Sequence, residues 1–144
     1  AVHTGISDIL FTNRPEEKAD CMDQYLRSLE PLVSPHRVNG ELSKKAQQGE
    51  RIFEKAGCIH CHNGAYYTDK AMYDVGTGID ECEGTKFDTP TLKEVWRTAP
   101  YLYNGSAKTI REVLTRFNEG DRHGTTSDLS EKEIEALEEY ILSL

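Results

Sequence analysis

Small and apolar residues recur at helical spacing in segment 43–57 of the chain (SKKAQQGERIFEKAG). Ser43 precedes this run and is a good N-cap residue, and Gly57 follows it at a position where helices commonly end. One stripe carries the small and apolar positions, which are Ala46, Gly49, Phe53 and Ala56. The pattern therefore predicts a helix that packs through this stripe.

The C-terminal segment 130–144 (SEKEIEALEEYILSL) has a second helical pattern. Ser130 and Glu133 have the spacing of a capping box. A glycine inside a helix costs about 1 kcal/mol relative to alanine. Gly49 therefore indicates that another helix approaches closely there, and Tyr140 is the neighbour we expect. The apolar face of this second helix, which Tyr140 flanks, consists of Ile134, Leu137, Ile141 and Leu144.

Two shorter helices are predicted between these segments. Thr91 and Glu94 suggest a cap for residues 92–97. Thr109 and Glu112 suggest one for residues 110–117, whose inward positions are Ile110, Val113, Leu114 and Phe117. Residues rich in Gly, Asp, Thr and Tyr fill the stretch 63–90 and indicate a loop. Since little of the chain alternates as a strand would, the predicted fold class is all-α.

A further helix is predicted near the N-terminus, in segment 14–31. Its apolar face is formed by Met22, Tyr25, Leu26 and Leu29, and we expect Met22 to lie in a core. Both this segment and the C-terminal one end in an aromatic residue followed by Leu or Ile and then Ser-Leu. We therefore divide the chain into residues 1–38, a terminal helix with a linker, and residues 39–144, a helical domain.

Composition and charge restrict the class of partner. The 144 residues suit one domain, and a hydrophobic content of 37% argues against disorder. Acidic residues outnumber basic ones by 25 to 17, so we expect a basic protein or a small molecule as partner and no nucleic acid. No apolar run reaches the roughly 18 residues that a transmembrane helix requires. The chain begins at Ala1 rather than Met, and we expect it to be processed or excised from a longer protein.

The most specific motif is C-x-x-C-H, formed by Cys58, Cys61 and His62. It is the attachment signature of c-type haem. Two thiols three residues apart can each add to a haem vinyl group, and the next residue then lies under the iron as its proximal ligand. A thioredoxin-like pair would need a surrounding βαβ pattern, and a zinc knuckle would need further paired ligands. A disulfide between the two cysteines would leave His62 unexplained. The motif therefore predicts one covalent haem c.

Residues 40–144 resemble a class I cytochrome c domain. Within them, residues 87–114 (FDTPTLKEVWRTAPYLYNGSAKTIREVL) are similar to the C-terminal haem domain of the bacterial di-haem cytochrome c peroxidases. They are also similar to relatives of those peroxidases that mature methylamine dehydrogenase. Residues 72–78 (MYDVGTG) and 42–53 (LSKKAQQGERIF) fit the same family. The resemblance implies a class I cytochrome c-like helical domain wrapped around one covalently bound haem, with an extra helix before it.

The resemblance also implies a role for the domain. In the family, peroxide is reduced at the N-terminal haem, and the C-terminal haem accepts electrons and passes them on. Since the chain has one C-x-x-C-H, residues 1–32 are either the tail of a preceding haem domain or an ordinary extension of a monohaem cytochrome. In the first interpretation, residues 31–41 form the linker. We expect electron transfer, with a redox protein or that preceding domain as partner. The alternative is an open haem site that reacts with peroxide or binds a small ligand.

The motif does not fix the sixth iron ligand. In the peroxidases it is a methionine on the helix after the Gly-Ser turn, and the matching position here is Phe117, which cannot ligate. His123 ranks first, because a flexible loop bounded by glycines would swing it to the iron. Met72, ten residues after His62, is the second candidate residue, and an open or water-bound site is the remaining alternative. In the methylamine-related members one haem uses tyrosine, and the tyrosines near this haem are Tyr66, Tyr67, Tyr73, Tyr101 and Tyr103.

The resemblance further suggests a calcium ion, which in the peroxidases binds backbone carbonyls of a T-x-P-Y string between the two domains. The matching residues are Thr98 and Pro100. Haem c is attached on the oxidising side of the bacterial membrane, so we expect a periplasmic or otherwise extracytoplasmic protein. Thiols tend to pair there, which makes a Cys21–Cys82 disulfide one hypothesis. His36 lies outside the predicted domain, and we expect it to be exposed.

Overall fold

The computed structural model describes residues 16–144. The chain divides into two units, residues 1–31 and residues 32–144. In the first unit, α2 spans Glu16–Ser28. None of the described helices is long and apolar enough to cross a membrane. Met22 exposes 47% of its surface, so the expectation that it lies in a core is wrong. The other residues of the same face are exposed as well: Tyr25, Leu26 and Leu29.

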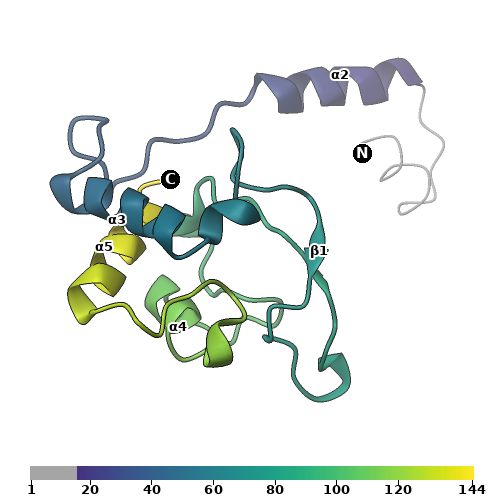
Figure 1. Ribbon diagram of the computed structural model, residues 1–144. Coiled ribbons are helices and arrows are strands. Elements are labelled where there is room, and N and C mark those ends of the chain that lie inside the picture. The colour runs from purple at the N-terminus through teal and green to yellow at the C-terminus, as the bar shows by residue number, and fades with distance from the viewer. Residues whose placement is uncertain (1–15) are drawn as a thin grey trace. The chain divides into compact units, whose positions relative to one another are not determined.

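The second unit is mainly helical and irregular (Figure 1). Its only strands in the described chain are β1 and β2, which pair antiparallel with Met72 opposite Asp88 and Tyr73 opposite Phe87. The elements, with η for 3₁₀ turns, are α3 (Lys44–Lys55), η2 (Cys58–His60), β1 (Met72–Tyr73), η3 (Asp80–Cys82), β2 (Phe87–Asp88), η4 (Val95–Arg97), α4 (Ile110–Leu114), η5 (Glu119–Asp121) and α5 (Glu131–Leu142). The expected helical class is therefore observed, and the long loop contains the short strand pair.

Helix α3 begins and ends where its sequence predicts. The Ser43 hydroxyl accepts a hydrogen bond from the Ala46 N–H at 3.0 Å, and Gly57 leaves the helix in the left-handed conformation at φ +78°. A Cβ on Gly49 would lie 1.9 Å from the Ala136 carbonyl oxygen and 2.7 Å from the Tyr140 Cβ. The prediction that Gly49 admits a second helix beside Tyr140 is confirmed.

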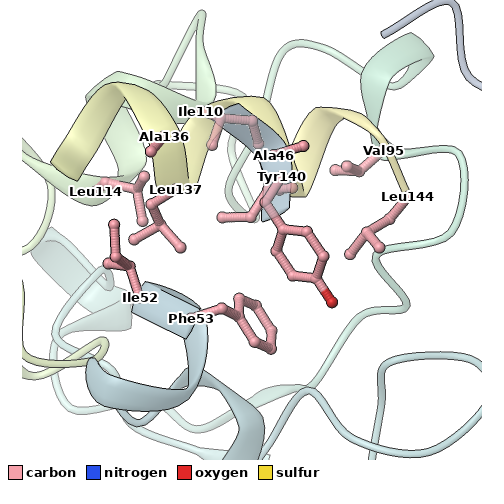
Figure 2. Packing of buried hydrophobic residues seen from close by; sticks show 11 residues of the cluster. Ala46, Ile52, Phe53, Val95, Ile110, Leu114, Ala136, Leu137, Tyr140 and Leu144 are labelled. Carbon is pink, nitrogen blue, oxygen red and sulfur yellow. The ribbon is translucent and has the colours of Figure 1, made fainter. Parts of the chain in front are cut away.

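Helix α5 carries much of the remaining core, shown in Figure 2, and Val95, Ile110 and Leu114 come from η4 and α4. Ser130 and Glu133 form the predicted capping box. Between the two helices, the Phe53 and Tyr140 rings meet edge to face with centroids 5.4 Å apart. Four residues of α5 and Leu144, which follows the helix, are at most 5% exposed: Ile134, Leu137, Tyr140, Ile141 and Leu144. The contact between α3 and α5 thus forms the core against which the loops of the second unit pack.

The two shorter predicted helices are reduced in the structure. Residues 92–97 form only the 3₁₀ turn η4, because Glu94 takes a left-handed conformation at φ +58°. The Glu94 carboxylate accepts the Leu32 N–H at 2.7 Å, a contact with a residue far along the chain. Helix α4 ends at Leu114, three residues before the predicted end at Phe117.

The segment that the sequence suggested as a linker is docked on the end of α5. The Ser34 hydroxyl donates to the Leu142 carbonyl at 2.6 Å, and the Arg37 Nε donates to the Ser143 carbonyl at 2.9 Å. His36 is half-buried, with its Nδ1 3.4 Å from a Glu139 carboxylate oxygen. These contacts contradict the expected exposure of His36. They also place residues 32–38 in the second unit, ahead of the predicted boundary at residue 39.

Candidate functional site

A cavity of about 470 Å³ lies in the second unit. Its size falls within the range of about 300–1,000 Å³ that is typical of cofactor sites. Cys61 and His62 from the C-x-x-C-H motif and His123 from the later loop all line it. Most of the remaining wall is apolar, and its apolar residues include Val75, Leu92, Val95, Leu102, Ile110 and Val113.

The attachment segment is a tight turn that follows α3 directly. Gly57 redirects the chain into η2, and the His62 N–H donates to the Cys58 carbonyl at 2.9 Å. Burial raises the pKa of the Cys58 thiol to about 11. A thioredoxin-like cysteine has a lowered pKa and reacts as a thiolate. The raised pKa of Cys58 is therefore the opposite of what a thioredoxin-like dithiol pair requires.

His62 is 8% exposed and has a fixed ring orientation. Its Nδ1 lies 3.1 Å from the Tyr67 carbonyl oxygen, which only accepts, so Nδ1 carries the proton and donates. Burial lowers the pKa of His62, although hydrogen bonds to the Tyr67 and Pro90 carbonyls act in the opposite direction. The ring is therefore neutral at pH 7, with the lone pair on Nε2. This is the arrangement that a metal-ligating histidine needs.

The structure brings His123 opposite His62. The two ring centroids are 6.2 Å apart, and the ring planes make an angle of 41°. Burial, with a smaller effect of the neighbouring His62, lowers the pKa of His123 to about 4. A neutral imidazole of this kind is able to coordinate iron. The first-ranked ligand from the sequence thus lies across the cavity from the motif histidine.

The loop that carries His123 is fixed by hydrogen bonds, in contrast to the flexible loop that the sequence suggested. The Thr125 N–H donates to the Ala56 carbonyl at 2.9 Å. Gly124 has φ +86°, and a Cβ there would lie 3.5 Å from the Cys58 Sγ and 3.1 Å from the Ala56 carbonyl oxygen. The loop therefore packs against the haem-attachment end of α3, and Gly124 leaves the space for it.

Sequence reasoning missed the residues that hold this loop, Asn118 and Asp121. Asn118 is 6% exposed, and its amide bonds the backbone on both sides of the His123–Gly124 peptide. The Asp121 carboxylate accepts the backbone N–H groups of Thr126 at 2.8 Å and Ser127 at 3.0 Å. The available signal was the Asn-Glu-Gly-Asp run, since Asn and Asp side chains commonly bond nearby backbone groups in turns.

The second-ranked ligand, Met72, lies away from the cavity. It belongs to β1, is 57% exposed and does not line the cavity wall. Tyr73 and Val75, one and three residues later, do line it. Side chains alternate between the faces of an extended segment, so Met72 falls on the outer face.

The tyrosine hydroxyls near the cavity already have partners. Tyr73 donates to Asp69 at 2.7 Å, and Tyr101 donates to the Val95 carbonyl at 3.0 Å. Tyr66, by contrast, is 66% exposed. The remaining two contact other described residues: Tyr67 with the Tyr140 hydroxyl at 3.2 Å, and Tyr103 with the Ile79 N–H at 3.4 Å. His62 and His123 are therefore better placed to coordinate one iron than any of these tyrosines.

Thr98 and Pro100, the residues matched to calcium carbonyls, both line the cavity. Among the described residues, no group of three or more His, Cys, Asp or Glu side chains is arranged to hold a metal ion. Calcium binding through backbone carbonyls stays a prediction. The Cys21–Cys82 disulfide also stays a prediction, because the two cysteines, both free thiols in the structure, lie in different units.

The residues present fit a haem c. Two thiols and one imidazole come from a single turn, a second neutral imidazole faces the first, and an apolar cavity lies beside them. The indole Nε1 of Trp96, a residue that does not line the cavity itself, is buried without a hydrogen-bond partner among the described residues. Its neighbours Val95 and Thr98 line the cavity. A buried donor of this kind normally has an acceptor.

Comparison with known families and proteins agrees with this reading. The family of RoxA-like, cytochrome c-like proteins matches residues 86–121, which include most of the segment that carries the sequence resemblance. The chain is 30% identical to hydrazine synthase subunit gamma of Kuenenia stuttgartiensis, over 83% of this chain and 47% of that protein. It is 28% identical to the cytochrome-c peroxidase IdrP2 of Pseudomonas sp. (strain SCT), over 87% of this chain and 47% of that protein.

Two further matches concern a more distant relative and a solved structure. The methylamine utilization protein MauG of Methylophilus methylotrophus is 27% identical over 68% of this chain and 34% of that protein. A structure of Kuenenia stuttgartiensis hydrazine synthase under xenon pressure matches with a TM-score of 0.76 and 28% identity, over 92% of this chain and 56% of that one. The chain thus spans about half the length of the first two relatives. Together, these matches support a di-haem cytochrome c peroxidase-like family for this chain.

Proposed function

We propose that this chain is an electron-transfer domain that binds one covalent haem c. Cys58 and Cys61 form the thioether bonds, and His62 and His123 are the two axial iron ligands. The observation that carries the proposal is the 6.2 Å between the two imidazole centroids. Two imidazoles on opposite sides of one metal, each bonded at about 2.0–2.1 Å, place their ring centres about 6.3 Å apart. The separation between the rings is therefore the one that a shared iron requires.

The residues of the chain support transfer of electrons more than reaction of a substrate. Bound haem would supply a one-electron couple of its iron. The Tyr67 carbonyl holds His62 in one tautomer, and the hydrogen-bonded loop holds His123 in place. If His62 and His123 both held the iron, they would leave no open position for peroxide. Because both ligands are held from outside, little rearrangement accompanies a change of charge at the site.

The partner that fits is a basic redox protein or a preceding haem domain. The formal charge of −8 favours a positively charged surface for encounter. The relatives are about twice as long as this chain, which supports a neighbouring domain as electron donor or acceptor. We place the protein outside the bacterial cytoplasm, because haem c is attached there.

Optical and EPR spectra of the purified holoprotein test the proposal. We expect a low-spin, six-coordinate ferric haem, and we expect His123→Ala to convert it to a high-spin form. Added imidazole should restore the low-spin spectrum of His123→Ala, because it replaces the missing ring. Met72→Ala serves as the matched control and should leave the spectrum unchanged. A high-spin wild-type protein would favour the open-site alternative suggested by the peroxidase relatives, and an unchanged low-spin spectrum of His123→Ala would assign the sixth ligand to another residue.

A further inference from the structure

One buried side-chain amide makes three hydrogen bonds in the loop that carries His123. The Asn118 Oδ1 accepts the His123 N–H at 2.8 Å. The Asn118 Nδ2 donates to the Gly124 carbonyl at 2.8 Å and to the Thr126 hydroxyl at 2.7 Å. Both donor hydrogens of the amide are therefore used, and Asn118 is only 6% exposed.

These bonds join the His123 backbone to a fixed part of the fold. The Thr126 hydroxyl, which accepts from Asn118, donates in turn to the Leu114 carbonyl at 2.7 Å, and both of these bonds are buried. Leu114 is the last residue of α4, and its side chain lies in the core. A continuous path of hydrogen bonds thus runs from the end of α4 through Thr126 and Asn118 to the His123 N–H.

Other contacts hold the loop at different points. Arg122 bonds Asp74 at 2.5 Å on the surface, and the Asp121 carboxylate bonds residues 126 and 127. Among the hydrogen bonds of the described residues, only those of Asn118 reach the backbone N–H of His123 itself. A ligand on a loop detaches when the loop opens locally, and buried hydrogen bonds oppose such opening.

We propose that Asn118 is a positioning residue that keeps His123 on the haem iron, acting through the His123 backbone and anchored by Thr126. The inference rests on the proposed function, because it takes His123 as the axial ligand. Asn118 itself is not among the residues that line the cavity. Its effect is to lower the rate at which the ligand leaves, so the site stays six-coordinate.

Carbon monoxide binding to the reduced holoprotein tests this inference, because carbon monoxide takes the position that His123 leaves. We expect Asn118→Ala to bind it at least tenfold faster than the wild type, with the haem still covalently attached. Thr126→Val, which removes the anchor, should show a smaller increase. Thr126→Ser keeps the hydroxyl and should behave as the wild type. The matched control is Asn104→Ala, because Asn104 is an exposed turn residue whose Oδ1 accepts only the Ser106 N–H, at 3.1 Å.

The outcomes separate this inference from the proposed function. A wild-type protein that binds carbon monoxide without delay, or an unchanged spectrum in His123→Ala, overturns the axial ligand and the inference with it. If His123 proves to be the ligand but Asn118→Ala binds carbon monoxide at the wild-type rate, only the inference is overturned. If Asn118→Ala does not accumulate, equal rates for Thr126→Val and Thr126→Ser overturn it. A purely structural role would lower the unfolding midpoint without changing the rate in the folded protein.

Discussion

Replacing Gly49 by alanine should destabilise the protein even though alanine is the better helix former. The new Cβ would lie 1.9 Å from the Ala136 carbonyl oxygen, whereas ordinary contact begins near 3.4 Å. The atoms it meets are backbone and Cβ atoms, which cannot rotate away. The helices α3 and α5 therefore have to separate by about 1.5 Å at this point. That movement loosens the packing of Phe53 against Tyr140.

The expected size follows from two opposing terms. Overpacking of a core typically costs about 1–3 kcal/mol, and more where backbone atoms collide. The better helix propensity of alanine offsets about 1 kcal/mol of this cost. We therefore expect the free energy of unfolding to fall by about 2 kcal/mol, the upper end of the difference between these terms because the colliding atoms are backbone. The melting temperature should fall by about 6–12 °C.

Urea and thermal unfolding, followed by circular dichroism, measure this change. The control is the exposed neighbour Gln48, where Gln48→Ala should be more stable than Gln48→Gly by about 1 kcal/mol. The haem spectrum of Gly49→Ala should stay that of the wild type, because local hydrogen bonds hold His62 and His123. A Gly49→Ala protein as stable as the wild type would refute the close approach of the two helices.

Two further predictions concern charge and potential. Hydrogen bonds from the Ser130 N–H and hydroxyl, followed by the ion pair with Lys55, lower the pKa of Glu133 from 4.5 to about 2. A lowered pKa in the folded state stabilises the protein above the unfolded pKa, so this contribution should be lost as the pH falls from about 4.5 to about 2. The melting temperature of Glu133→Gln should depend less on pH in that window than that of the wild type, whereas the exposed control Glu119→Gln should follow the wild type. Axial ligands set haem potentials over a range of about 0.8 V, and a Met/His pair gives higher values than two histidines. Redox titration of His123→Met should therefore show a raised midpoint potential, and an unchanged potential would contradict His123 as a ligand.

The parts of the fold that were predictable from the sequence are those with local causes. Ser43, Gly57 and the Ser130–Glu133 box act on backbone groups within a few residues, so the bounds of α3 and α5 follow from short stretches. The apolar stripes of these helices are long enough to show their period. The close helix contact at Gly49 was also predictable, because a glycine in a helix interior usually indicates close packing by a neighbouring element.

The parts that were not predictable depend on distant residues. Glu94 has the spacing of a capping residue, but its carboxylate bonds the Leu32 N–H, and its backbone takes the left-handed conformation that breaks the helix. In the same way, His36 is drawn to α5 through Glu139, more than a hundred residues later. Propensity is weak against such contacts, and a single sequence does not reveal them.

The residues of the site likewise divide into those that a short motif specifies and those whose placement depends on other parts of the chain. Cys58, Cys61 and His62 are specified by a five-residue motif, so the sequence locates them directly. His123 was reached because Phe117 cannot ligate and a histidine follows nearby. The spacing thus led to His123 as the proposed ligand, but it did not predict the rigidity of its loop. That rigidity comes from Asn118, whose three partners lie five to eight residues later.

One element sets the distance between the two imidazoles. Helix α3 ends at Lys55, and the residues that follow it position the segments of both His62 and His123. On one side, the chain turns at Gly57 into the segment that carries His62. On the other side, the Ala56 carbonyl accepts the Thr125 N–H, two residues from His123. Helix α3 packs against α5 through the buried core. The positions of both imidazole rings are therefore fixed relative to the same pair of helices. A loop position without such a connection would leave His123 free to move. The docking of the loop on Ala56 therefore supports the proposal that a histidine far along the chain holds the haem iron.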